Sequence, residues 1–337
     1  MNKGSERRGP NLSEARLRYD PEGKINRFLQ VRSFLKREFA QAIDQVEADE
    51  SVRDLMHKTL DALLAGGTNL IRSKRSAAVK EKELPSHKKD VVTQTDIDTQ
   101  KIVFEVLEQS FGADNQYLVG EEGVSGNKDS HSVFLVDALD GTRAFMHGYD
   151  DYSMSLAHEQ DGVLDFAFVF APEKGKIFFG NRQGSYSLDI DGTRKIKTET
   201  RPFTESVFYS DFSDVVETDE MNEAMAHFWA DIRGKHKPFK EVRYNSAALG
   251  IPDTVEKSGN IFIGFDLELV DVAAGAYCAL KAGSKVWTSI TKERPGFILV
   301  TNGDPETEEL CIRSLEHHFP EYYHAMYQVS ADQTAFK

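Results

Sequence analysis

The chain has 337 residues, of which 40% are hydrophobic and 28% are charged, and its formal net charge is −14. This composition predicts a globular protein of one large domain or two closely packed ones, and the acidic balance argues against a general nucleic-acid-polymer binder. With only Cys278 and Cys311 there is no disulfide framework or cysteine-rich zinc site, and no apolar run is long enough to span a membrane, so we expect a cytoplasmic protein.

Helical spacing of apolar residues dominates the N-terminal part of the chain. It follows a polar stretch, residues 1–23, that shows no period and predicts a loose arm. We therefore treat residues 1–50 as an N-terminal arm with an extra helix. The charged stretch from Lys74 to Lys89 predicts a loop. The helices expected in this part comprise residues 24–46, 52–64 and 97–111.

The hydrophobic period changes to two after residue 151. Short alternating runs separated by turn signals predict an antiparallel meander with strands at 152–158, 163–170, 176–180 and 186–190. From about residue 202 strands and helices alternate. We accordingly expect two halves: residues 51–200, which bind metal and phosphate and contain the antiparallel sheet, and residues 201–337, an α/β half that completes the active site.

One stretch in the first half combines a buried strand with two acids. Residues 133–136 are apolar, and Asp137 and Asp140 follow, with Gly141 and Thr142 directly after them. Three positions in a turn let both carboxylates and the Leu139 carbonyl converge, and hard oxygen ligands at that density suit Mg²⁺. The amides of Gly141 and Thr142 open the next helix and would face an anion. The stretch predicts a metal and phosphate site.

Two other interpretations of this stretch exist. The strand could simply end in an Asx turn with Asp140 as a helix N-cap. Phosphatases with an aspartyl nucleophile use Asp-x-Asp-Gly-Thr after a buried strand, but here the spacing is one residue longer. The extra residue would rotate Asp137 away from the nucleophile position.

Acids at other strand and helix ends are further candidates. Asp90 has no capping role, whereas Asp96 is most simply an N-cap. Glu121 and Glu122 follow a short strand and, taken alone, indicate solvated loop charges. Asp271 lies in the first turn of a small-residue helix, where it could cap or face a cleft. The acidic run from Asp211 to Glu220 lacks calcium-loop spacing and is typical of solvated surface.

Four of these segments resemble, in order and spacing, the inositol monophosphatase family. The resemblance covers roughly residues 51–320 and includes the segment around Ser246, which looks like the family's Gly-Ser-Ala segment. The four segments are Asp90-Val-Val-Thr-Gln-Thr-Asp96, Gly120-Glu-Glu-Gly123, Asp137-Ala-Leu-Asp-Gly-Thr142 and Val270-Asp-Val-Ala-Ala-Gly275.

The resemblance implies an αβαβα five-layer sandwich of the sugar-phosphatase type, usually a homodimer. It implies a lithium-sensitive phosphatase that uses about two or three Mg²⁺ ions and a metal-activated water. Asp90 and Thr142 would orient the water, and Gly141, Thr142 and Ser246 would bind substrate. The implied metal ligands are Glu121, Asp137, the Leu139 carbonyl, Asp140 and Asp271.

Departures from the family pattern bear on the substrate. The family's Pro is Ala138 here, and its Trp before the last Asp is Val270. Gly264 stands where many inositol-specific members carry an acid, which predicts broad or shifted specificity among small phosphate monoesters. Asp266 or Glu268 could compensate for the missing acid.

Other activities therefore stay open. Within the family they are a 3′(2′),5′-bisphosphate nucleotidase or a fructose-1,6-bisphosphatase. The alternative of another class is an inactive member that binds a phosphorylated ligand or a protein partner, although no predicted metal carboxylate is missing from the sequence.

Overall fold

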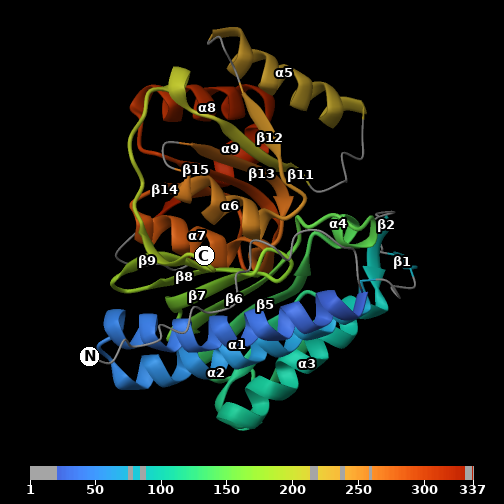
Figure 1. Cartoon of the computed structure of the whole chain (residues 1–337). Coiled ribbons are helices and arrows are strands. Elements are labelled where there is room, and N and C mark those ends of the chain that lie inside the picture. Colours follow the sequence, from blue (N-terminus) through green and yellow to red (C-terminus); the bar gives the residue numbers. More distant parts are fainter. Residues whose placement is uncertain are drawn as a thin grey trace.

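Two β-sheets separated and flanked by helices form the framework of the chain (Figure 1). The computed structural model describes residues 21–74, 79–83, 89–212, 219–235, 240–257, 260–330 and 336. The layers follow the order helices, sheet, helices, sheet, helices. The predicted five-layer αβαβα sandwich is confirmed.

The first sheet has eight strands in the order β10-β9-β8-β7-β6-β5-β3-β4. The meander expected from the period-two pattern corresponds to β6 to β9, which lie within an antiparallel run from β5 to β10. β3 pairs antiparallel with β4 and parallel with β5. Its strands are β3 (Tyr117–Gly120), β4 (Gly123–Gly126), β5 (Ser132–Asp140), β6 (Ser153–Gln160), β7 (Val163–Ala171), β8 (Lys176–Asn181), β9 (Gly184–Asp189) and β10 (Gly192–Ile196).

The second sheet has six strands in the order β12-β11-β13-β15-β14-β16. β11 runs parallel to both of its neighbours, as the alternation of strand and helix in this half requires, and the remaining pairs are antiparallel. Its strands are β11 (Phe208–Phe212), β12 (Glu241–Arg243), β13 (Ile261–Leu267), β14 (Lys285–Thr288), β15 (Gly296–Thr301) and β16 (Tyr327–Val329).

Three layers of helices cover the faces of these sheets. Helices α1 (Pro21–Val46), α2 (Glu50–Ser73) and α3 (Gln94–Phe111) pack on the outer face of the first sheet. Helices α6 (Ala247–Glu256) and α7 (Leu269–Ala282) lie between the sheets, and α5 (Asp219–Lys235), α8 (Pro305–His318) and α9 (Pro320–Ala325) cover the second sheet. Each interface holds its own apolar cluster.

Small side chains explain how α7 fits between two sheets. Ala273, Ala274 and Ala276 are buried, so the helix has an apolar surface on nearly every side. A Cβ on Gly275 would lie 3.0 Å from Ile251 Cβ and 3.1 Å from the Ala248 carbonyl oxygen. Glycine therefore allows α6 and α7 to cross closely, which brings their first turns to the same region.

The N-terminal region differs in part from its prediction. The expected helix at 24–46 is α1, whereas residues 1–20 of the expected arm lie outside the described residues. The stretch 74–89, predicted as a loop, contains β1 (Val79–Glu83), which pairs with β2 (Lys89–Thr93). The division at residue 200 stays a prediction; β10 ends at Ile196 and β11 begins at Phe208.

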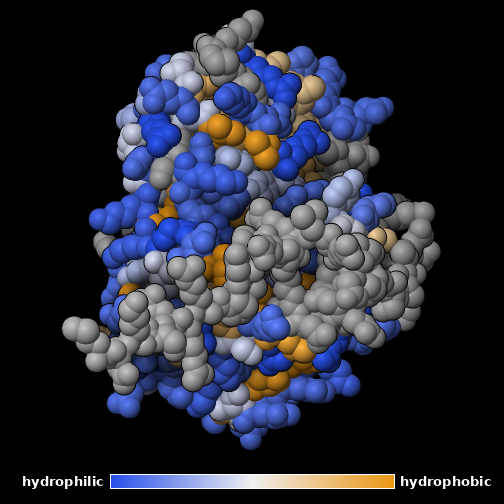
Figure 2. Space-filling model, in the orientation of Figure 1, coloured by the Kyte–Doolittle hydropathy of each residue, from blue (hydrophilic) through white to orange (hydrophobic). Residues whose placement is uncertain are grey.

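The surface seen in Figure 2 is mainly hydrophilic where residues are described, and its apolar groups form small separate patches. None of the helices in the described ranges combines the length and the apolar character that crossing a membrane requires.

Candidate metal and phosphate site

A β-bulge at the end of β5 brings the two central acids together. Asp137 pairs with Ser155 on β6 and Asp140 with Ser153, so three steps along β5 match two steps along β6. In a regular strand, residues three apart face opposite sides of the sheet. The extra residue changes that alternation, and the negative charge of Asp140 lies near enough to Asp137 to raise the pKa of its carboxyl group.

Asp137 is a buried carboxylate with three partly buried carboxylates around it. Its exposed fraction is 1%, and its one backbone donor is the amide of Leu139, at 2.9 Å from Oδ1. Burial raises the pKa of Asp137 well above its usual value, and the charges of Glu121, Asp140 and Asp271 raise it further. All four predicted metal carboxylates are therefore neighbours, although they come from three separate elements.

Asp140 is held by the first turn of α6. Its Oδ2 accepts hydrogen bonds from Ser246 Oγ at 2.7 Å and from the amide of Ala248 at 2.6 Å. Burial raises the pKa of Asp140 to about 7, the charge of Asp211 adds to this, and the bonds from Ser246 and Ala248 oppose it. Ser246 itself is the N-cap of α6 and lies 3.0 Å from Ser153 Oγ.

Asp271 has one of the two roles left open for it, that of a helix cap, and it also lies near Asp137. Its Oδ2 accepts the amide of Glu268 at 2.7 Å, so it caps the start of α7. Its negative charge also raises the pKa of Asp137. Ser155 Oγ donates to the Val270 carbonyl at 3.0 Å, which ties this end of α7 to the first sheet.

The donor set fits a hard divalent cation. A buried carboxylate surrounded by three others is costly unless a positive charge compensates it, and carboxylate and carbonyl oxygens are the ligands that Mg²⁺ prefers. In the described part of the chain, however, no three acidic, His or Cys side chains are already arranged to hold a metal ion together. Asp140 and Asp271 instead direct an oxygen at backbone amides.

The hydroxyl of Thr142 hydrogen-bonds to Asp96, a residue that the sequence did not assign to it. Its hydroxyl donates to Asp96 Oδ1 at 2.8 Å and approaches the Leu139 carbonyl at 3.2 Å. The expected partner was Asp90, whose backbone lies in β2 and whose side chain is outside the described residues. The role expected for Asp90 therefore stays a prediction, and among the described side chains Asp96 lies beside Thr142.

Asp96 is also not the N-cap of α3 but its third residue. The N-cap is Thr93, whose amide donates to Asp96 Oδ2 at 3.0 Å and whose hydroxyl also hydrogen-bonds to it. Burial raises the pKa of Asp96, while the bonds from Thr93 and Thr142 oppose that rise. One carboxylate thus caps a helix and orients the Thr142 hydroxyl.

Gly141 makes the turn between β5 and the short helix α4 (Thr142–Met146). Its φ of +91° is a left-handed conformation that favours glycine. A Cβ there would lie 2.7 Å from the Asn245 carbonyl oxygen and 3.0 Å from that of Asp151. The close approach of three chain segments leaves no room for a side chain on this side of the site.

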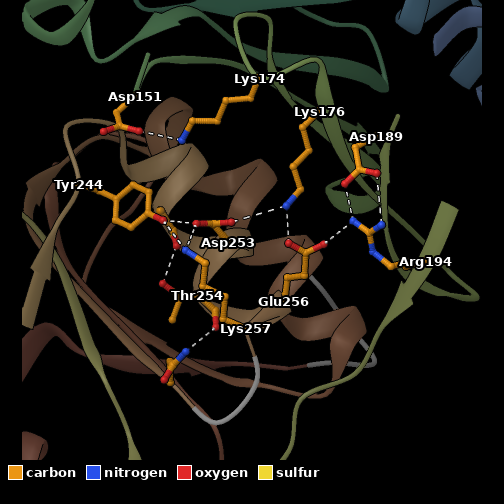
Figure 3. A network of polar contacts seen from close by, with 12 residues as sticks. Asp151, Lys174, Lys176, Asp189, Arg194, Tyr244, Asp253, Thr254, Glu256 and Lys257 are labelled. Atoms are coloured by element: carbon orange, nitrogen blue, oxygen red, sulfur yellow. Dashed lines mark hydrogen bonds and ion pairs between the residues drawn. The ribbon is translucent and has the colours of Figure 1, made fainter. Parts of the chain in front are cut away.

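A network of polar contacts supports α6 (Figure 3). Asp253 accepts hydrogen bonds from Tyr244 Oη and, at 2.6 Å, from Lys257 Nζ. Lys176 on β8 lies 3.7 Å from Asp253 and also pairs with Glu256. Because Tyr244 stands two residues before Ser246, the network fixes the segment that presents Ser246 to Asp140.

The two acids expected to compensate for Gly264 have other surroundings. Asp266 has a φ of +56°. Burial raises the pKa of Tyr322 on α9, and the charge of Asp266 raises it further. The Glu268 side chain accepts a backbone amide in the first turn of α7. The structure thus provides a capping role for Glu268 and places Asp266 beside Tyr322.

Asp211, which sequence reasoning assigned to solvated surface, is instead half-buried in β11 near Asp140. Like Asp137, it follows a short run of apolar residues, and that pattern was the signal that could have found it.

The fold and the site together define a layered α/β protein with a group of neighbouring acids at a strand end. Comparison with known proteins agrees: the model of the inositol monophosphatase family matches residues 53–322. This chain belongs to that family, a family of metal-dependent phosphatases.

Individual relatives are distant. The chain is 28% identical over 200 residues to a protein named putative Nus factor SuhB from Neisseria meningitidis, covering 58% of this chain and 73% of the relative. It is 27% identical to the fructose-1,6-bisphosphatase/inositol-1-monophosphatase of Thermotoga maritima, covering 62% and 75%. The inositol monophosphatase structure from Anabaena superposes with a TM-score of 0.63 at 23% identity, covering 80% of this chain and 98% of that one.

Proposed function

We propose that this chain is a Mg²⁺-dependent phosphatase that hydrolyses a small phosphate monoester, such as an inositol or sugar phosphate, with water as the nucleophile. The observation that carries the proposal is the buried Asp137 carboxylate with three other carboxylates around it. A bound cation would compensate the negative charge of such a group. Family membership supports the same reaction class.

Glu121, Asp137, Asp140, Asp271 and the Leu139 carbonyl are the proposed ligands. When bound there, Mg²⁺ supplies charge neutralisation for a phosphate dianion and lowers the pKa of a nearby water.

Thr142 and Asp96 would orient the attacking water. The Thr142 hydroxyl donates a hydrogen bond to Asp96, so the lone pairs of the hydroxyl oxygen can accept a hydrogen bond from water. Asp96, whose raised pKa keeps it a stronger base than an exposed carboxylate, would favour that orientation. We propose Asp96 for the role first assigned to Asp90.

Gly141, Thr142 and Ser246 would contact the phosphate side of the substrate. The absence of a side chain on Gly141 lets the Asn245 and Asp151 carbonyls approach the turn that begins α4. Ser246 holds Asp140 in place through its hydroxyl. No covalent intermediate with the protein is required.

A second candidate is an inactive family member that binds a phosphorylated ligand or a protein partner. The relatives named Nus factor favour it, because that name does not describe a phosphatase. These names do not settle the expected absence of a nucleic-acid partner, which stays a prediction. The expected homodimer also stays a prediction. The Thermotoga maritima relative favours an activity toward sugar bisphosphates as well as inositol phosphates.

A phosphate-release screen separates these candidates. Purified protein is assayed against inositol 1-phosphate, fructose 1,6-bisphosphate and a 3′,5′-bisphosphate nucleotide, with Mg²⁺ or with EDTA. We expect turnover with Mg²⁺, none with EDTA, and inhibition by millimolar Li⁺. Absence of turnover on every substrate, with tight binding of one of them, would favour the inactive alternative.

A further inference from the structure

Asp211 lies at the point where three strands of the second sheet reach the site. It is directly opposite Gly264 on β13. On the other side, the Ser210 carbonyl accepts the amide of Tyr244 at 2.9 Å, so the segment leading to Ser246 leaves β12 beside Asp211. Its side chain is half-buried at the carboxyl end of β11.

Strand alternation directs Asp211 toward α6 and α7. Tyr209 and Phe262 are paired across β11 and β13 and belong to the core between the sheets. Asp211, two residues after Tyr209, shares its face. The first turns of the helices on this face carry Ser246 and Asp271, so Asp211 points to the region where these two residues meet the metal site.

Gly264 has no side chain, so in the pair that it forms with Asp211 the carboxylate comes from Asp211. A Cβ on Gly264 would lie 2.4 Å from Leu267 Cδ1 and 3.1 Å from Ile298 Cγ2, so apolar side chains already fill the space an acid would need. The proximity of Asp211 to Asp140 agrees with this placement, because its charge contributes to the raised pKa of Asp140.

The chemistry of a carboxylate limits what can bind it. An ionised carboxylate only accepts hydrogen bonds, so its partner must carry donors such as hydroxyl groups. A phosphate group at the same place would be repelled by the like charge. A site built to bind hydroxyls discriminates strongly against analogues that lack them.

We propose that Asp211 is a specificity residue that accepts hydrogen bonds from hydroxyl groups on the alcohol portion of a polyol monophosphate. The inference rests on the proposed phosphatase function and names its substrate class: hydroxyl-bearing monophosphates, and not bisphosphates whose second phosphate would face Asp211. Because Asp211 approaches from β11 and not from β13, it would meet different hydroxyls from those an acid at position 264 would bind.

Steady-state kinetics of Asp211→Ala and Asp211→Asn on two substrates test the proposal. Inositol 1-phosphate carries the hydroxyls, and propyl phosphate has the reacting group without them. We expect kcat/KM for inositol 1-phosphate to fall about ten- to hundredfold in the Ala variant, mainly through KM. The kcat/KM for propyl phosphate should change by less than about threefold. Asp44→Asn, which removes an exposed acid of α1, is the matched charge control.

Three other results would each overturn the proposal. They are an equal loss of kcat/KM on both substrates, a raised Mg²⁺ requirement in the Asp211 variants, and no loss of kcat/KM on inositol 1-phosphate. If the wild-type protein hydrolyses neither substrate, the phosphatase function fails separately. Calorimetry then measures the binding of inositol 1-phosphate and of propyl phosphate in the presence of Mg²⁺. The Asp211 variants should bind inositol 1-phosphate more weakly and propyl phosphate as tightly as the wild type does. The Asn variant keeps the shape of Asp211, so it separates loss of charge from misfolding.

Discussion

Thr142 directs its hydroxyl proton at the Asp96 carboxylate, with the Leu139 carbonyl as a more distant acceptor. The same hydroxyl therefore links α3, the end of β5 and the start of α4. Sequence separation hid this contact, because Asp96 and Thr142 are 46 residues apart.

Replacing Thr142 tests whether that hydroxyl takes part in turnover. Thr142→Val keeps the side-chain shape and removes the donor, so we expect kcat to fall about a hundredfold or more with KM little changed. Thr142→Ser keeps the hydroxyl and should retain activity within about tenfold. If the two variants have similar kcat values, Thr142 does not orient the water.

The acids of the site show what a sequence can and cannot reveal at this scale. Asp137 and Asp140 stand out because two charges directly follow an apolar strand. Asp96 matched a helix cap so well that its second contact could not be inferred from local spacing. Asp211 was assigned to surface because the acids that follow it suggested a solvated run, whereas its β11 position makes it half-buried.

At the scale of elements, α6 is held from both ends. Its first turn binds Asp140, and its last turn joins the network of Asp253, Glu256 and Lys257 (Figure 3). Although burial raises the pKa of Asp253, the hydrogen bonds and charge from Lys257 and Tyr244 outweigh it and hold that pKa below the usual value. Asp253 has an exposed fraction of 9%.

Asp253→Asn should therefore destabilise the protein in a pH-dependent manner. A carboxyl whose pKa is lower when folded stabilises the protein above its unfolded pKa, and this contribution is lost as the pH falls through the folded value. We expect a loss of about 1–2 kcal/mol in the free energy of unfolding at pH 7. The difference from wild type should shrink as the pH falls from about 5 toward 3.

Urea denaturation of both proteins across this range measures the difference. Asp61→Asn, which removes an exposed ion pair with Lys36, should change stability by less than about 1 kcal/mol. A difference at Asp253 that grows on acidification would contradict the assigned direction of its pKa.

Helix α1 is a second element whose role can be tested. It precedes the matched family region, yet Phe39 is fully buried against Phe168 and Phe179, with ring centroids 5.4 and 5.2 Å away. The periodic pattern of 24–46 predicted the helix but could not show that it packs directly on the first sheet.

Phe39→Ala should lower the free energy of unfolding by about 3–5 kcal/mol, because it leaves a cavity in the core of α1, α2 and the sheet. Phe34→Ala, on the same helix but only partly buried, is the matched control and should cost less. Chemical denaturation compares them. A loss below about 1 kcal/mol at Phe39 would show that α1 is not integral to the fold.

At the scale of the whole molecule, the site is assembled from both halves of the chain. β3 and β5 bring Glu121, Asp137 and Asp140 from the first sheet, and α6, α7 and β11 bring Ser246, Asp271 and Asp211 from the second half. The layers could be predicted from periodicity and family motifs together. The contacts between the halves could not, because residues such as Asp140 and Ser246 are 106 positions apart in the sequence.

The central proposal for the whole molecule is that the carboxylates around Asp137 hold Mg²⁺ for phosphate-ester hydrolysis. The most direct test is the Mg²⁺ dependence of phosphate release from inositol 1-phosphate by the wild-type protein and by Asp140→Asn. The substituted amide keeps an acceptor for Ser246 and Ala248 and removes a buried charge, so the variant should fold with unchanged or higher thermal stability in EDTA. We predict saturable activation of the wild type by Mg²⁺, none in EDTA, and a loss of about a thousandfold or more in the variant. Turnover by the wild type that is equal with Mg²⁺ and with EDTA, or a variant with most of the wild-type activity, would contradict this proposal.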